Sequence, residues 1–282
     1  MVPTVFNAFG LVNRRGLAAG ASALLGLGLY AFSATAQTEA PAGETEQPTQ
    51  VAAAWDLQFA LPEIAEAFLA DTGEVIEISF GLSGELTDEI RKGAPYQIYM
   101  AADEKNAQSL ARDGMTPDDG VVYGVGRIAL FVPNGSRLKP DPSLNDLRKA
   151  LSDGRLIRLS IPNPKNAVFG QSAEQALRKA GLWDEIQPKL VLGQTGAQAA
   201  ELAVSNSVSG GIIAYPLALS NRIAGRGTIG LIPVDQHDPV QQTMVLLNDA
   251  GTVAQEFYSY LQQPAAREIF RKHGFFLREE LR

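Results

Sequence analysis

The sequence predicts an α/β protein of two lobes, each built on a mostly parallel central sheet. Short β-rich runs alternate with amphipathic helical patterns from Val51 onward, which is typical of βα units. The β-like run Val121–Val132 is long for one strand and contains Gly124 and Gly126, and glycine accepts the bend that a hinge needs. With a returning strand at Gln241–Leu247, the chain crosses twice between lobes.

Each element follows from its residue pattern. Leu57, Leu61, Ile64 and Phe68 recur at helical spacing and stop at Gly73, a residue that suits a helix C-terminus. The expected strands are 51–54, 75–80, 97–102, 121–132, 156–161, 189–192, 211–215 and 241–247. The expected helices are 57–68, 85–92, 143–151, 171–180, 197–204, 253–261 and 265–272.

The two crossings, near Gly126 and between 234 and 241, divide the chain into lobes. We expect residues 51–126 and 238–282 to form lobe I, and residues 127–237 to form lobe II. The last two helices have apolar faces that need a docking surface, so they complete lobe I.

The N-terminus reads as a signal peptide over residues 1–36. Arg14 and Arg15 precede an apolar run, Leu17–Phe32, and small residues end at Ala36, where cleavage is expected. The run is shorter than the roughly 20 residues of a membrane-spanning helix. We therefore predict a periplasmic protein without a membrane span, exported by the general or the twin-arginine route. Residues 37–50, rich in Glu, Pro, Thr and Ala, predict a flexible leader.

Composition excludes several functions. The chain has no Cys, so disulfides, thiolate chemistry and a lipidated cysteine are excluded. Its net charge of −7 argues against a nucleic-acid partner, which needs a basic surface. His237 and His273 lack metal-ligand spacing, and no nucleophile elbow or phosphate-binding loop occurs. We expect no enzyme, metal or cofactor.

Three junctions between a strand and a helix, 54–56, 80–84 and 163–170, are candidate anion sites. The first amides of a helix lack internal partners, and the helix dipole adds partial positive charge. Ser83 adds a hydroxyl, or simply caps its helix. The loop 193–196 is a fourth candidate or an ordinary capped loop, and Tyr215 points into a cleft or packs.

Several segments follow one another from about Val51 to Phe275: ALPEIAEAFLADTG, SFGLSGELTDEIRKGAPYQIYMAADE, YGVGRIALFVP, IPNPKNAVFGQSAEQALRKAGLWDEIQPKLVLG and AAREIFRKHGF. In this order they resemble the molybdate-binding component of bacterial ABC importers. The resemblance implies a type 2 periplasmic binding protein that holds a tetrahedral oxyanion, molybdate or tungstate, in its cleft. It also implies a membrane permease and ATPase as partners. We expect a monomer, with the oxyanion as cargo rather than cofactor.

The resemblance also implies roles for individual residues. Ser83 donates its hydroxyl and amide, while Phe169 and Gly196 lie where amides are offered. Trp55 replaces a Ser or Thr of the family, and Ala214 stands where some members carry a binding Tyr, with Tyr215 one position later. The carboxylate in the first loop would repel a dianion unless it points away. The predicted binding residues are Trp55, Asp56, Ser83, Gly84, Phe169, Gly170, Gly196 and Tyr215.

Two other functions stay open. One is the binding of another small anion, or of an organic carboxylate stacked on Trp55. The other is a role as an envelope interaction protein that no longer transports. Titration with anions separates these from the leading hypothesis.

Overall fold

The structure, a computed structural model, describes residues 48–277 and 280 of the 282-residue chain. The predicted signal peptide and residues 37–47 of the leader lie outside the described residues. Thr49 and Gln50, which we had assigned to the leader, belong instead to strand β1 (Thr49–Ala54), where they pair with Ile76 and Glu77.

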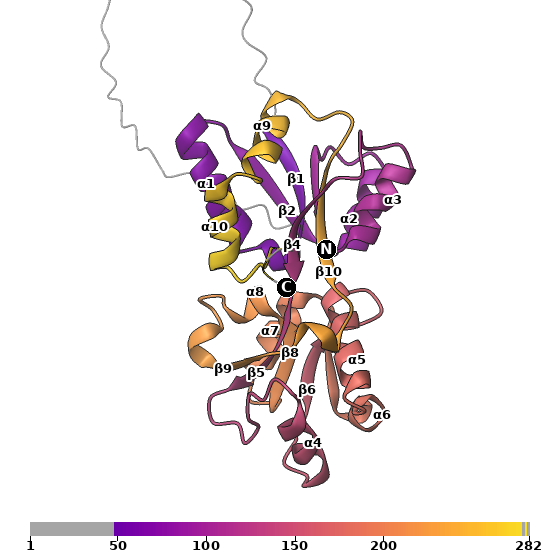
Figure 1. The fold of residues 1–282 in the computed structure, drawn as a ribbon, viewed down its shortest axis with the longest axis vertical. Helices are drawn as coiled ribbons and strands as arrows, with labels where there is room; N and C mark the ends of the chain where they lie inside the picture. The colour runs from indigo at the N-terminus through magenta and orange to yellow at the C-terminus, as the bar shows by residue number, and fades with distance from the viewer. Residues whose placement is uncertain (1–47, 278–279, 281–282) are drawn as a thin grey trace, which may run out of the picture. The chain divides into compact units, whose positions relative to one another are not determined.

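The first sheet contains five strands in the order β2-β1-β3-β10-β4 (Figure 1). β1 is parallel to both β2 and β3, whereas β10 is antiparallel to both β3 and β4. We call this sheet with its covering helices lobe I. The strands after β1 are β2 (Ile76–Gly81), β3 (Ile98–Ala101), β4 (Val121–Gly126) and β10 (Val240–Leu246).

The second sheet repeats this plan in the order β7-β6-β8-β5-β9, and it forms lobe II. β6 is parallel to β7 and β8, and β5 is antiparallel to β8 and β9. The strands are β5 (Ile128–Pro133), β6 (Leu159–Pro162), β7 (Leu190–Gly193), β8 (Gly210–Ala214) and β9 (Gly227–Leu231).

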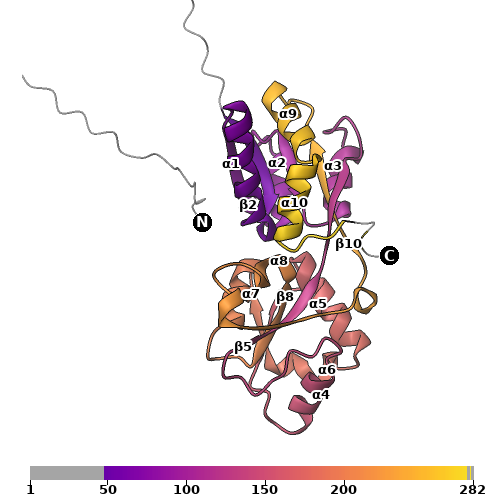
Figure 2. The same cartoon turned by 60° about the vertical axis from the view of Figure 1, so that its left-hand side comes forward.

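The α/β fold with two lobes is therefore confirmed, and four of the five strands in each sheet run in the same direction, with β10 and β5 as the exceptions. Both sheets are mixed, because each includes the strands that carry the chain between the lobes. β4 and β5 are separated only by Arg127 yet lie in different sheets. The chain returns from β9 to β10 through a short 3-10 turn, η4 (Val234–Gln236). Figures 1 and 2 show β4 and β10 in lobe I leading into and out of lobe II.

The helices largely match the sequence patterns. They are α1 (Ala60–Thr72), α2 (Ser83–Arg91), α3 (Glu104–Arg112), α4 (Asn145–Ser152), α5 (Val168–Lys179), α6 (Trp183–Ile186), α7 (Gly196–Ala203), α8 (Tyr215–Ala218), α9 (Thr252–Tyr260) and α10 (Pro264–Lys272). We had not predicted α3, α6, α8 or β9. In the described part of the chain, no helix is long and apolar enough to span a bilayer.

The C-terminal helices dock on lobe I, as their apolar faces predicted. Phe68 of α1 packs edge-on against Phe257 and Tyr260 of α9, with ring centroids 5.0 and 5.2 Å apart. Phe270 of α10 is buried in the same cluster. Each fully buried aromatic ring contributes about 1.5–3 kcal/mol to folding, so these helices stabilise lobe I. The two lobes form one compact unit, Pro48–Arg282.

Candidate ligand-binding site

A cavity of about 480 Å³ is lined by residues of both lobes. Lobe I contributes residues that follow the carboxyl ends of β1, β2 and β3, and lobe II contributes the residues around the start of α5 and α7. Ligands of open α/β sheets bind outside the carboxyl ends of the strands. Six of the eight predicted binding residues line this cavity: Trp55, Asp56, Ser83, Gly84, Phe169 and Gly196.

Ser83 is the first residue of α2 and is 6% exposed. The N-cap is Leu82, with no side-chain cap, so Ser83 is not the capping residue that the alternative interpretation required. Its Oγ accepts a hydrogen bond from the Ala102 amide at 3.0 Å. Since a hydroxyl is also a donor, its hydrogen stays available for a ligand.

The backbone of Ser83 is also held in place. Its carbonyl accepts hydrogen bonds from the hydroxyls of Thr87 at 2.8 Å and Tyr99 at 2.7 Å. Both partners are buried, so the start of α2 is tied to β3. The first amides of this uncapped helix therefore lie beside the Ser83 hydroxyl in a rigid frame, which suits an anion.

The start of α5 has the same uncapped character. Its N-cap, Ala167, makes no side-chain cap, and Phe169 lines the cavity with 6% of its surface exposed.

Gly170 is not among the residues that line the cavity. Its amide donates to the Ala167 carbonyl at 3.0 Å, and a Cβ there would lie 2.5 Å from the Pro162 carbonyl oxygen. This glycine lets α5 pack closely on the end of β6.

The loop before α7 is a capped loop, the simpler of the two interpretations. Thr195 is the N-cap and accepts from the Gln198 amide at 3.1 Å. Gly196 nevertheless lines the cavity as the first residue of the helix. The Thr195 cap therefore orders the loop that brings Gly196 to the site.

Trp55 and Asp56 belong to a 3-10 turn, η1 (Trp55–Leu57), directly after β1. The Trp55 ring stacks on Phe80, with centroids 6.2 Å apart. Asp56 is 3% exposed, and Nε2 of Gln242 on β10 donates to its Oδ2. Burial raises the pKa of the Asp56 carboxyl from 3.8 to about 6, although the Gln242 bond opposes the shift. The carboxyl is thus directed to β10 while the residue lines the cavity.

Tyr215 lies outside the lining of this cavity. Its amide donates to the Arg127 carbonyl at 2.8 Å, and its ring packs near Phe276, with centroids 6.1 Å apart. Packing is therefore the role that the structure gives it. Leu217, two residues further on, lines the cavity instead.

Sequence reasoning missed several charged residues that line the cavity. Arg91 is paired with Asp113 at 2.7 Å and Asp88 at 3.6 Å. Lys105 sits in α3, which was not predicted, while Lys165 falls in the predicted 163–170 loop, where its charge was a usable signal. Among the residues that line the cavity, the buried polar side chains are the carboxyl of Asp56 and the hydroxyls of Ser83 and Thr87.

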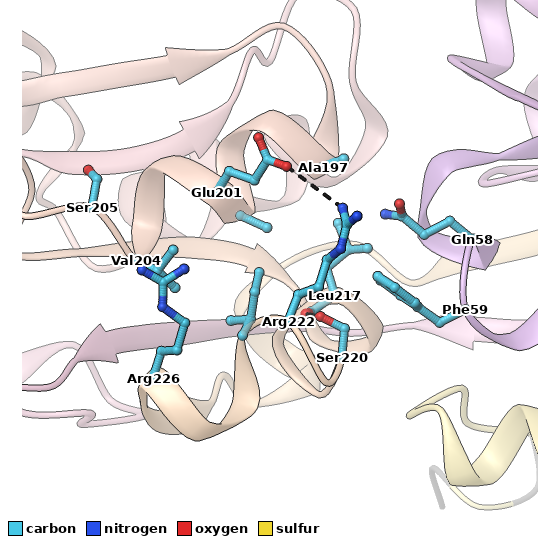
Figure 3. A pocket seen from close by; sticks show the side chains of 12 residues that line it. Gln58, Phe59, Ala197, Glu201, Val204, Ser205, Leu217, Ser220, Arg222 and Arg226 are labelled. Atoms are coloured by element: carbon cyan, nitrogen blue, oxygen red, sulfur yellow. Dashed lines mark hydrogen bonds and ion pairs between the residues drawn. The ribbon is translucent and has the colours of Figure 1, made fainter. Parts of the chain in front are cut away.

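A second cavity, of about 510 Å³, lies between Gln58 and Phe59 on one side and α7, α8 and the residues after α8 on the other (Figure 3). Its charged pair, Arg222 and Glu201, is 4.0 Å apart and largely exposed. None of the predicted binding residues lines it. On the α7 side it is lined by Ala197, Ala200, Glu201 and Val204.

Comparison with known proteins identifies the family of the chain. The chain is 30% identical over 218 residues to a molybdate-binding protein of Rhodobacter capsulatus, covering 76% of this chain and 82% of that protein. The periplasmic molybdate-binding protein of Azotobacter vinelandii superposes with a TM-score of 0.72 at 25% identity, covering 81% of this chain and 99% of that one. A sulfate-binding protein of Mycobacterium tuberculosis shares the fold, with a TM-score of 0.66 at 17% identity and coverage of 81% and 86%. Residues 49–276 match the model of the bacterial extracellular solute-binding proteins, and the chain belongs to that family.

Proposed function

We propose that the chain is the periplasmic solute-binding component of an ABC importer and captures a tetrahedral oxyanion, molybdate or tungstate, between its lobes. One observation carries this proposal: the Ser83 hydroxyl and the uncapped starts of α2 and α5 line a single cavity shared by both lobes. Membership of a solute-binding family makes the chain a binding protein rather than an enzyme. The two molybdate-binding relatives favour this class of ligand.

The donors of the cavity suffice for this task. A hydrogen bond to a charged group contributes about 1.5–3 kcal/mol, and micromolar to nanomolar binding needs about 8–12 kcal/mol. Five or six donors therefore account for the affinity. We propose that they are the Ser83 hydroxyl and the amides of Trp55, Ser83, Gly84, Phe169 and Gly196, all of residues that line the cavity.

Closure of the lobes would make capture selective. A ligand that touches both lobes favours the closed state, because only that state offers all its contacts. We propose that residues 51–126 with 238–282 move as lobe I against 127–237 as lobe II. The permease and ATPase would then accept the loaded protein, which reaches the periplasm after cleavage near Ala36.

A second candidate ligand is a different small anion, such as sulfate or an organic carboxylate. Trp55 lines the cavity and stacks on Phe80, so it narrows the site and offers an aromatic surface. The fold shared with a sulfate-binding protein is compatible with this ligand.

Isothermal titration of the mature protein with molybdate, tungstate, sulfate and phosphate tests the proposal. Tight one-to-one saturation by the two heavier anions, with little heat from sulfate, is the expected result. Binding of sulfate or a carboxylate alone would favour the second candidate. No response to any anion would refute capture of an anion and leave the envelope interaction protein.

Ser83→Ala should weaken binding at least about tenfold, since it removes a hydrogen bond to a charged group. Ser205→Ala is the matched control: Ser205 lines the second cavity, and its Oγ donates to the Leu202 carbonyl. The control should bind as the parent does. Weakening by Ser205→Ala with no effect of Ser83→Ala would place the ligand in the second cavity.

A further inference from the structure

Asp56 and Gln242 form a buried pair that is incomplete. Asp56 is 3% exposed and Gln242 is 0% exposed. Gln242 Nε2 donates to Asp56 Oδ2, whereas Gln242 Oε1 is buried and has no hydrogen-bond partner among the described residues. A buried acceptor without a donor costs free energy. A hydrogen-bond donor to Gln242 Oε1 would therefore stabilise the pair.

A proton on Asp56 would supply that hydrogen. An ionised carboxylate only accepts hydrogen bonds, whereas a carboxylic acid also carries one O–H donor. A carboxylic acid and a primary amide can exchange two hydrogen bonds, with N–H donating to one oxygen and O–H donating to the other amide atom. The chemistry of Gln242 thus matches the neutral acid better than the carboxylate.

Among the described residues, no cation contributes to the pKa of Asp56. The buried Arg127, which follows β4, donates to the Ile232 carbonyl and lies over the Phe276 ring, and β2 presents the apolar Phe80 to Trp55 of η1. β10 presents the neutral Gln242, and β4 presents Tyr123, whose pKa is raised by burial and by the charge of Asp56. Of the helices packed on η1, α7 carries Glu201, which faces the second cavity, and α8 carries Tyr215, which packs on Phe276.

The charged groups of the cavity do not neutralise Asp56 either. Burial is the largest cause of its raised pKa, and the opposing causes are the hydrogen bonds from Gln242 and from its own backbone. The other charged residues that line the cavity are Glu85, Asp88, Arg91, Asp103, Lys105 and Lys165. A dianion that enters beside Ser83 therefore meets an uncompensated carboxylate in the wall.

We propose that Asp56 takes up one proton from solvent when a dianion binds, so that the site accepts a dianion only together with a proton. This rests on the proposed function. The proton neutralises the Asp56 carboxylate and gives Gln242 Oε1 a donor, while no covalent bond of the anion changes. Asp56 thereby makes affinity for dianions depend on pH, and it disfavours them in alkaline solution relative to singly charged anions.

The size of this effect follows from proton linkage. Burial already raises the pKa of Asp56 to about 6 in the free protein, and a bound dianion raises it further. Between the two pKa values, affinity falls by up to about tenfold for each pH unit. Below about pH 6 the acid form is already present, so the dependence levels off there.

Titration calorimetry with molybdate at about pH 7, repeated in buffers of different ionisation enthalpy, counts the protons. The slope of heat against buffer enthalpy should give an uptake approaching one proton per molybdate. Asp56→Asn should bind without uptake. Glu66→Gln, which changes an exposed carboxyl on α1 outside the cavity, should keep the uptake of the parent.

Binding by the parent without proton uptake, or equal uptake by Asp56→Asn, would overturn the role of Asp56 and leave the proposed function intact. Failure of the parent to bind either molybdate or tungstate would refute the proposed function itself. If Asp56→Asn does not fold, the proton uptake can be tested instead by infrared difference spectra of the parent labelled with ¹³C-aspartate. Molybdate should convert one labelled carboxylate band into a carboxylic acid band, and an unchanged spectrum would exclude the proton uptake.

Discussion

Asp56→Asn should stabilise the ligand-free protein at neutral pH and have little effect in acid. In the folded state, burial raises the pKa of Asp56 from 3.8 to about 6, so the unfolded chain ionises this group first as pH rises. The shift of about two units, at about 1.36 kcal/mol each, corresponds to about 3 kcal/mol. This penalty is absent below about pH 4, grows between pH 4 and 6, and is complete above about pH 6.

Asparagine removes the penalty and keeps the shape of the side chain. Its amide can also donate to Gln242 Oε1, the acceptor that now has no partner among the described residues. At about pH 8, Asp56→Asn should therefore be more stable than the parent by up to about 3 kcal/mol. At about pH 4 the two proteins should have similar stability.

Urea unfolding followed by circular dichroism, at several pH values between about 4 and 8, measures the difference. Glu66→Gln is again the control, because its carboxyl is exposed, and its difference from the parent should not change with pH in this way. Parallel stability curves for the parent and Asp56→Asn would refute the reasoning. An increase in the stability of the parent relative to Asp56→Asn as pH rises would also refute it.

Two further substitutions test the packing around the site, both by urea unfolding. Gly126→Ala should lower the free energy of unfolding by about 1–3 kcal/mol, because the added Cβ would lie 2.8 Å from the Phe169 ring and 3.0 Å from Val240. Gly124→Ala should cost much less, since the nearest atom there is 3.5 Å away; equal losses would contradict the argument. Thr195→Ala should lower the free energy of unfolding by about 1 kcal/mol, because it removes the side-chain cap of α7. Thr195→Ser keeps the hydroxyl and should lose much less stability. An equal loss from both substitutions would show that the hydroxyl is not the cause.

The fold was largely predictable because its strands and helices carry clear periodicity. The elements that were missed have weak patterns. α3 buries only Ala107 and Leu110 along a polar helix, and β9 is a five-residue strand with two glycines. The direction of the crossing strands was also beyond local patterns, because their antiparallel pairing joins residues far apart in the sequence, such as Val240 and Gly126.

The candidate site was predictable where it depends on chain order. A strand followed by a helix identifies the amides at 83 and 169, and six predicted residues line one cavity. The orientation of single side chains was not predictable. Tyr215 is one position from Ala214, and that offset is enough to direct it to Phe276. The bond between Asp56 and Gln242 joins residues 186 positions apart, so no local signal indicated it.

The nature of the donors decides what the cavity can distinguish. A site built on free cations would attract sulfate and molybdate alike, since both carry the same charge. In this cavity Arg91 is paired with acids, whereas Lys105 and Lys165 also line it. The Ser83 hydroxyl accepts a hydrogen bond from the Ala102 amide, and Tyr99 of β3 donates one to the Ser83 carbonyl. Donors at fixed positions favour one spacing of oxygen atoms, because an anion of another size leaves some of them unpaired. The ratio of molybdate to sulfate affinity therefore measures geometry rather than charge. Gly126→Ala, which disturbs Phe169, should lower this ratio more than Gly124→Ala, which leaves Phe169 in place.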